Sequence, residues 1–179
     1  MLSTGSLLLA SPGMHEETFD RTVIFMLEHD ESGSMGLVLN RPSDMLVSDA
    51  LPDFGSLVHP DRLFLGGPVE QDTALVLAEP LDPAAPGMHF MHRGIGLVDL
   101  TDDDTTRITL ERARVFSGYA GWGPRQLENE LRQGAWIIGD CEPADLWDAD
   151  HQNLWASIIA RQGDMREFLA AYPGQPWLN

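Results

Sequence analysis

The sequence predicts an α+β fold, with a mixed, largely antiparallel sheet and helices packed outside it. Segments typical of strands fill most of the chain before Pro124, whereas clear helical periodicity appears after it. The chain has no regular alternation of strands and helices and no internal repeat, which argues against a doubly wound parallel sheet. Its 179 residues are the usual size of one domain, so we expect a single domain over residues 1–179.

Three apolar segments near the N-terminus predict strands at residues 6–10, 22–28 and 35–39. The run from Val23 to Leu27 is continuously apolar, which is typical of a strand buried on both faces. A polar turn separates the second segment from the third. These two segments are therefore predicted to form a hairpin.

The middle of the chain predicts a short helix and four further strands. The helix is expected to begin near Ser48, a residue type that caps helix N-termini. Residues 62–65 and 74–78 are predicted to pair as a hairpin across an intervening turn. A proline-rich surface loop follows, and strands are then expected near residues 89–92 and 95–100.

The last third of the chain changes from strand to helix. A helical turn is predicted at residues 109–112 and a strand at 113–119. Pro124 suits the first position of a helix over residues 126–132, and Gly134 suits the position just after its end. A last strand is expected at 135–138, a helix with one apolar stripe at 152–160, and a third helix at 165–171.

The charge of the chain restricts its partners. It contains 28 Asp and Glu residues against 11 Lys and Arg residues, a formal net charge of −17. Phosphate backbones and anionic lipids are repelled by such a surface, so direct DNA binding and membrane binding are disfavoured. With one cysteine, Cys141, no signal peptide and no long apolar run, the sequence predicts a cytoplasmic protein.

Three loops carry residue types that could bind a small anionic ligand. One is the glycine-rich passage from a strand into the helix at 126–132, where free backbone N–H groups could receive an anion. The alternative is a tight corner with Trp122 packed over it. The other two loops hold Asn40-Arg41 and Gly66-Gly67, and they could line a pocket if they meet at one end of the sheet. The alternative is two turns in which Arg41 pairs with an acidic side chain. The candidate ligand-binding residues are Arg21, Asn40, Arg41, Gly66, Gly67, Gly121, Trp122, Gly123 and Gln126.

Residue patterns for metal binding and catalysis are missing from the sequence. His89 and His92 would point to opposite faces of a regular strand, so we expect no metal site there. The segment around Ser34 lacks the first glycine of the GxSxG nucleophile motif, because Ser32 stands in its place. We therefore predict no catalytic residues and no cofactor, and an enzymatic activity is disfavoured.

An ordered set of short motifs resembles the YqgE/AlgH family over almost the whole chain. The matching residues are Gly5, Leu7-Leu8, Ala10, Pro12, Met14, Phe19, Arg21-Thr22-Val23-Ile24, Gly36-Leu37-Val38-Leu39-Asn40-Arg41-Pro42, Leu65-Gly66-Gly67-Pro68-Val69, Gly118-Tyr119-Ala120-Gly121-Trp122-Gly123 and Gln126-Leu127-Glu128. Arg125 departs from the pattern, because the family more often has glycine or a small residue there. The resemblance implies a sheet curled into a pseudo-barrel with flanking helices.

The resemblance implies little about activity. Members of the family often carry the label of transcriptional regulator, linked to exopolysaccharide production, without assigned catalytic or ligand-binding residues. We expect a non-enzymatic protein that acts through a protein partner or a small ligand, with any effect on transcription being indirect. Two alternatives stay open: a binding module for a small anionic metabolite at the glycine-rich loops, and an enzyme that uses carboxylates and a histidine.

Overall fold

The computed structural model describes residues 2–12, 14, 18–55, 58, 61–101, 108–147 and 150–162. The helix expected at residues 165–171 lies outside this part of the chain. Within it, none of the helices is long and apolar enough to cross a membrane.

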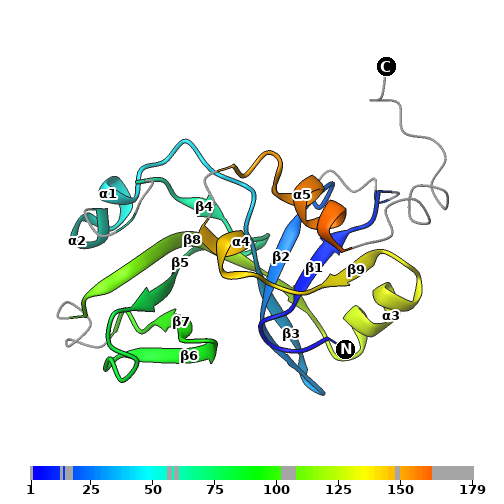
Figure 1. Cartoon of the computed structure of the whole chain (residues 1–179), viewed down its shortest axis with the longest axis horizontal. Coiled ribbons are helices and arrows are strands. Elements are labelled where there is room, and N and C mark those ends of the chain that lie inside the picture. The colour runs from blue at the N-terminus through cyan, green and yellow to red at the C-terminus, as the bar shows by residue number, and fades with distance from the viewer. Residues whose placement is uncertain are drawn as a thin grey trace.

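The described residues form a nine-stranded sheet with short helices around it (Figure 1). The neighbour order is β6-β7-β5-β8-β3-β2-β1-β9, and β4 pairs with β8 outside this path. The strands are β1 (Leu7–Ala10), β2 (Val23–Asp30), β3 (Gly33–Val38), β4 (Phe64–Leu65), β5 (Val69–Pro80), β6 (Met88–His92), β7 (Ile95–Val98), β8 (Leu110–Trp122) and β9 (Trp136–Gly139). The helices are α1 (Val47–Ala50), α2 (Pro52–Gly55), α3 (Gln126–Arg132), α4 (Pro143–Trp147) and α5 (Leu154–Arg161).

Every strand pair except β4–β8 is antiparallel. The sheet curls into a half-barrel, which confirms the predicted mixed, largely antiparallel α+β fold.

Strand β8 joins the two wings of the sheet seen in Figure 1. Most of its length pairs with β5, whereas its last residues pair with β3. Gly66 lies where the wings diverge, because its N–H donates to the Ser117 carbonyl at 2.8 Å and its carbonyl accepts from the Val38 N–H at 2.9 Å. A Cβ atom on Gly66 would lie 2.2 Å from the Gly118 carbonyl oxygen. The chain crosses over β8 at residue 66, and the short distance between the two backbones there requires glycine.

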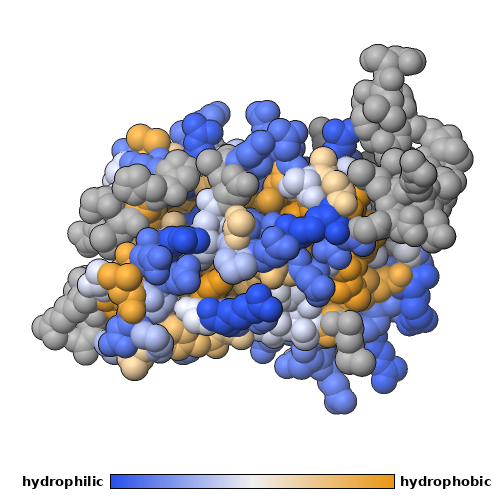
Figure 2. Space-filling view, in the orientation of Figure 1, coloured by the Kyte–Doolittle hydropathy of each residue, from blue (hydrophilic) through white to orange (hydrophobic). Residues whose placement is uncertain are grey.

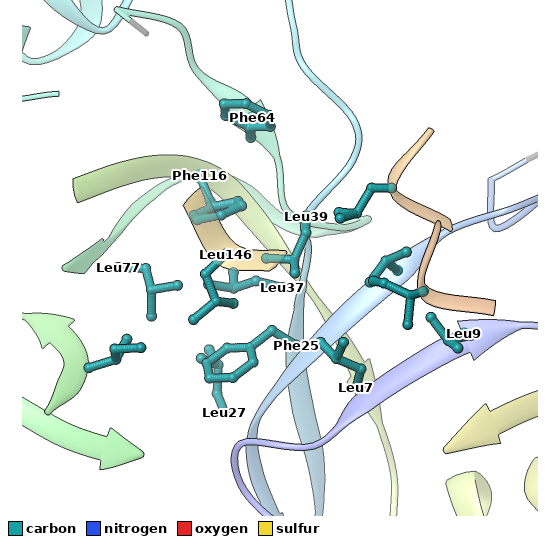
Figure 3. Close-up of a cluster of buried hydrophobic side chains, with 14 of the residues drawn as sticks. Leu7, Leu9, Phe25, Leu27, Leu37, Leu39, Phe64, Leu77, Phe116 and Leu146 are labelled. Atoms are coloured by element: carbon teal, nitrogen blue, oxygen red, sulfur yellow. The ribbon is translucent and has the colours of Figure 1, made fainter. Parts of the chain in front are cut away.

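The main hydrophobic core fills the concave side of the sheet. Figure 3 shows Phe25, Leu37 and Leu77 pointing toward one space, where Leu146 of α4 also lies. Residues of α5, Ile158 among them, belong to the same core.

The opposite face of β2 is also covered. Ile24 and Met26 pack there in a second core with Trp122 and Leu127 of α3. The five residues from Val23 to Leu27 are all buried, which confirms the prediction of a strand covered on both faces.

One predicted strand pairing and one predicted helical turn were wrong. Strand β4 pairs in parallel with β8 and not with β5, so residues 62–65 and 74–78 do not form a hairpin. The helical turn expected at residues 109–112 is instead the start of β8, since Leu110 already pairs with Pro80 of β5. In both cases long-range pairing with β8 replaces the local structure expected from neighbouring residues.

The helix starts also differ from the predictions. Ser48 lies inside α1, whose N-cap is Leu46, and the Ser48 N–H and hydroxyl both donate to the Asp61 carboxylate at 2.9 and 2.6 Å. Pro124 precedes the N-cap of α3 instead of occupying its first turn. Helix α4 was not predicted.

Candidate functional site

Asn40 and Arg41 hold together the loops at one end of the β2–β3 pair. The buried Asn40 amide accepts from the Val23 N–H at 3.0 Å and donates to the Arg21 carbonyl at 2.8 Å. The Arg41 guanidinium donates to the Asp20 carbonyl, and burial lowers its pKa while the neighbouring Asp20 charge raises it. These predicted ligand-binding groups thus already bind the backbone of the turn before β2.

Gly66 and Gly67 lie against the backbone of β8. A Cβ atom on Gly67 would come within 2.1 Å of the Tyr119 carbonyl carbon, as close as the contact at Gly66. No room for a ligand exists between these two backbones. Both glycines therefore serve the crossing of the chain over β8.

The corner before α3 is a packed hydrogen-bonded cluster. The Glu130 carboxylate accepts from the indole N–H groups of Trp122 and Trp136, each at 2.8 Å, and from the Gln126 amide at 2.9 Å. The Gln126 amide oxygen accepts from the Gly123 N–H at 3.1 Å. This arrangement supports the alternative interpretation of the glycine-rich passage, a tight corner with Trp122 packed over it.

Arg125, the residue that departs from the family pattern, has a φ of 62° and is the N-cap of α3. This left-handed region favours glycine over other residue types. Glycine, which has no Cβ atom, would adopt this backbone conformation without strain.

The three candidate loops do not meet in one pocket. Trp122 pairs with Ser34 near the start of β3, whereas Asn40 and Arg41 follow the end of that strand. About six residues of extended chain separate the two places, or roughly 20 Å. The Gly66 loop lies between them and contacts the Arg41 side, where the Leu65 N–H donates to the Arg41 carbonyl at 2.8 Å.

Gly121 and Trp122 line a cavity of about 410 Å³ beside the β2–β3 hairpin. The charged residues that line it are the exposed carboxylates Glu28 and Asp30, and none of its described lining residues is lysine or arginine. Hydrogen bonds from Ser32 lower the pKa of Asp30 and hold it in the charged form. The charge of this cavity is unfavourable for the anionic metabolite expected at the glycine-rich loops.

The histidines of β6 lie differently from the prediction. A bulge between Phe90 and His92 shifts the register, so that His89 pairs with Leu97 and His92 with Ile95. Paired residues share a face, and Leu97 and Ile95 are two apart on β7, so the two histidines lie on the same face. Among the described residues, no group of three or more His, Cys, Asp or Glu side chains could hold a metal ion.

Cys141 is a packed thiol. Burial and the neighbouring Asp145 carboxylate raise its pKa to about 12, so the thiol stays protonated at neutral pH. Asp145 is itself buried and binds Arg161 of α5 through both carboxylate oxygens, at 2.9 and 2.7 Å. The Asp145–Arg161 ion pair joins α4 to α5. A thiol that stays protonated is a poor nucleophile.

A further hollow lies between the segment before α1 and the start of β5. We name it the Met45–Leu65 groove. Its volume is about 470 Å³, and its lining residues are Ser43, Asp44, Met45, Ala50, Leu63, Leu65, Gln71, Asp72, Thr73, Ala74 and Ser117. Met45 is 53% exposed and Leu65 is 47% exposed, so two large apolar side chains are exposed along the same hollow.

Hydrogen bonds hold both walls of the groove. On one side, the Ser43 N–H donates to the Leu63 carbonyl at 2.9 Å and the Leu63 N–H donates to the Met45 carbonyl at 3.0 Å. On the other side, the pairing of β5 with β8 skips from Val69 to Ala74, so the residues between them bulge outward. The Ser117 hydroxyl donates to the Gln71 carbonyl and holds this bulge.

The predictions from sequence missed this groove. The apolar run Met45-Leu46-Val47 between Asp44 and Ser48 was the only local signal, and it does not show which segments lie opposite. Much of the visible surface is hydrophilic, with apolar residues exposed in separate places between polar ones (Figure 2).

Comparisons with known proteins agree with this fold. A family model described as AlgH-like matches residues 7–166. A UPF0301 protein of Streptomyces avermitilis is 43% identical over 183 residues, covering 98% of this chain and 95% of that protein. A UPF0301 protein of Mycobacterium avium is 39% identical over 175 residues, covering 94% of this chain and 87% of that protein.

Two solved structures are similar over nearly the whole chain. The crystal structure of a protein from Corynebacterium diphtheriae has a TM-score of 0.83 and 27% identity, and the match covers 90% of this chain and 88% of that one. The solution structure of AlgH from Pseudomonas aeruginosa has a TM-score of 0.72 and 29% identity, and covers 96% of this chain and 95% of that one.

Proposed function

The chain belongs to the AlgH-like family, and we propose that it is a non-enzymatic protein that docks a protein partner in the Met45–Leu65 groove. The observation that carries this proposal is the exposure of Met45 and Leu65 on walls that hydrogen bonds hold in place. A fixed apolar hollow on a hydrophilic surface is typical of a binding site. Any effect on transcription would then pass through the partner.

The chemistry of the groove favours binding over catalysis. Among the residues that the structure describes, its lining contains no histidine, cysteine, lysine or arginine. The hydroxyls of Ser43 and Ser117 donate to the Leu63 and Gln71 carbonyls. Both hydroxyls are thus bonded to backbone carbonyls, and among the described residues neither donates to the Asp44 or Asp72 carboxylate that could act as its general base.

The exposed side chains can supply a useful part of a binding energy. Burying a whole leucine or methionine side chain contributes roughly 1.5–3 kcal/mol, so covering the exposed halves of Met45 and Leu65 contributes about 2 kcal/mol together. Since a few central residues usually dominate an interface, these two are the expected hot spots.

The proposal can be tested by comparing partner capture by the full chain with that by two variants. Leu65→Asp places a charge in the groove, and Leu81→Asp places the same charge at a site that is 61% exposed and near the other end of β5. A partner that the unaltered chain captures is identified by mass spectrometry, purified, and titrated against each variant by calorimetry. Leu65→Asp should weaken binding by about tenfold or more, while Leu81→Asp should leave it unchanged. Equal affinities for all three proteins would refute docking in the groove.

A further inference from the structure

The charges around the Met45–Leu65 groove define the chemistry of its partner. Resting on the proposed docking function, we infer that the groove takes a protein segment with an apolar anchor side chain flanked by lysine or arginine. The groove has an apolar part made by Met45, Leu63 and Leu65, and it has one exposed carboxylate on each wall, Asp44 and Asp72.

The two carboxylates come from segments far apart in the sequence. Asp44 lies between Ser43 and Met45, on the wall that is tied to Leu63. Asp72 lies in the outward bulge of β5, on the wall that the Ser117 hydroxyl holds through the Gln71 carbonyl. A segment lying in the groove therefore passes between two negative charges.

Charge complementarity selects the occupant. None of the described residues that line the groove is basic and could pair with an acidic segment, and the whole chain carries a formal charge of −17. Like charges facing each other suppress binding of wrong partners, and opposite charges speed the encounter of right ones. The same charges disfavour nucleic acid and anionic lipid as occupants, so a basic protein segment fits best.

The size of the groove fits a short segment. A volume of about 470 Å³ lies within the range of roughly 300–1,000 Å³ that is usual for ligand pockets. It can hold an apolar side chain and its neighbours, whereas a flat interface between folded domains needs no such hollow.

A peptide selection tests this inference without knowledge of the natural partner. Phage-displayed random 12-residue peptides are selected on the full chain, and the enriched sequences are synthesised and titrated by fluorescence anisotropy. Enriched peptides should combine an apolar residue with lysine or arginine, and they should lose affinity as salt rises.

Matched variants test whether the carboxylates of Asp44 and Asp72 contribute to peptide binding. The double substitution Asp44→Asn with Asp72→Asn should weaken peptide binding about three- to tenfold, as expected for two partly exposed ion pairs. The double substitution Glu31→Gln with Glu128→Gln removes the same charge at another hollow and should leave binding unchanged.

The outcomes separate the two proposals. If the enriched peptides are apolar without basic residues and Leu65→Asp abolishes their binding, docking in the groove stands and the inferred basic chemistry is wrong. If the Asp44/Asp72 and Glu31/Glu128 variants weaken binding equally, the effect is one of net charge, and the inference is again wrong. If no enriched peptide responds to Leu65→Asp, both proposals fail.

Discussion

Replacing Glu130 by alanine should destabilise the fold strongly, because one carboxylate satisfies three donors at the corner before α3. Its partners are the indole N–H groups of Trp122 and Trp136 and the side-chain amide of Gln126. Trp122 is 7% exposed and Trp136 is 5% exposed, so water has little access to either indole. Each unsatisfied buried donor costs roughly 1–3 kcal/mol, and the expected loss for the two indoles is therefore about 3 kcal/mol.

The assay is urea denaturation followed by tryptophan fluorescence, with thermal unfolding as a second measurement. For a chain of this length, a loss of about 3 kcal/mol corresponds to a fall in Tm of roughly 6–12 °C. Glu128→Ala is the matched control, since Glu128 is on the same helix and belongs to its first turn. If Glu130→Ala and Glu128→Ala have the same small effect, the corner is not the structural element described here and a ligand role for Trp122 and Gln126 regains support.

Three further predictions concern the other loops and the thiol. Gly67→Ala should lower the free energy of unfolding by about 3 kcal/mol in urea denaturation, because its Cβ atom would lie 2.1 Å from the Tyr119 carbonyl carbon. An unchanged midpoint would contradict the close passage of this loop over β8. Asn40→Ala should lower the free energy of unfolding by about 2–3 kcal/mol in the same assay, because the amide makes two hydrogen bonds to the backbone. In a thermal-shift screen of phosphorylated metabolites, we expect no stabilisation that Asn40→Ala removes. The pKa of Cys141 is raised from 9.0 to about 12 in the folded protein. Between pH 9 and pH 12 the unfolded chain therefore releases the thiol proton while the folded protein retains it. The contribution of Cys141 to the free energy of unfolding is full below pH 9 and is lost across this range. Alkylation of Cys141 by iodoacetamide at pH 8 should accordingly be much slower in the native protein than in urea, and equal rates would refute a buried neutral thiol.

Much of the sheet could be predicted from the apolar runs. Residues 23–27 are apolar without interruption because the half-barrel has a core on each face of β2, one with Phe25 and one with Ile24. The β2–β3 hairpin followed from its polar turn, since neighbouring strands joined by a short turn usually pair.

The pairing of β4 could not be predicted in the same way. Its two residues lie beside Phe116 and Ser117 of β8, about 50 positions later in the chain. That position depends on the glycine crossing at Gly66 and on the outward bulge at the start of β5. Both are contacts between distant segments, and no local pattern encodes them.

In the candidate site, too, the sequence indicated individual residues but not their contacts with distant segments. The sequence identified unusual residues such as Asn40 and Gln126, but their hydrogen-bond partners, the Arg21 carbonyl and Glu130, decide that they are structural. The Met45–Leu65 groove exists only when the segment before α1 and the bulge of β5 face each other. An exposed apolar pair in a loop indicates nothing specific until that opposite wall is known.

The most direct test of docking in the groove is site-specific photo-crosslinking to the purified partner. A photoreactive phenylalanine analogue is placed at Leu65 in the groove, or at Leu81 as the control near the other end of β5. Docking in the groove predicts a single covalent adduct from position 65, lost in the presence of an enriched groove-binding peptide, and none from position 81. An adduct from position 81 alone, or one from position 65 that the peptide does not prevent, would contradict docking in the groove.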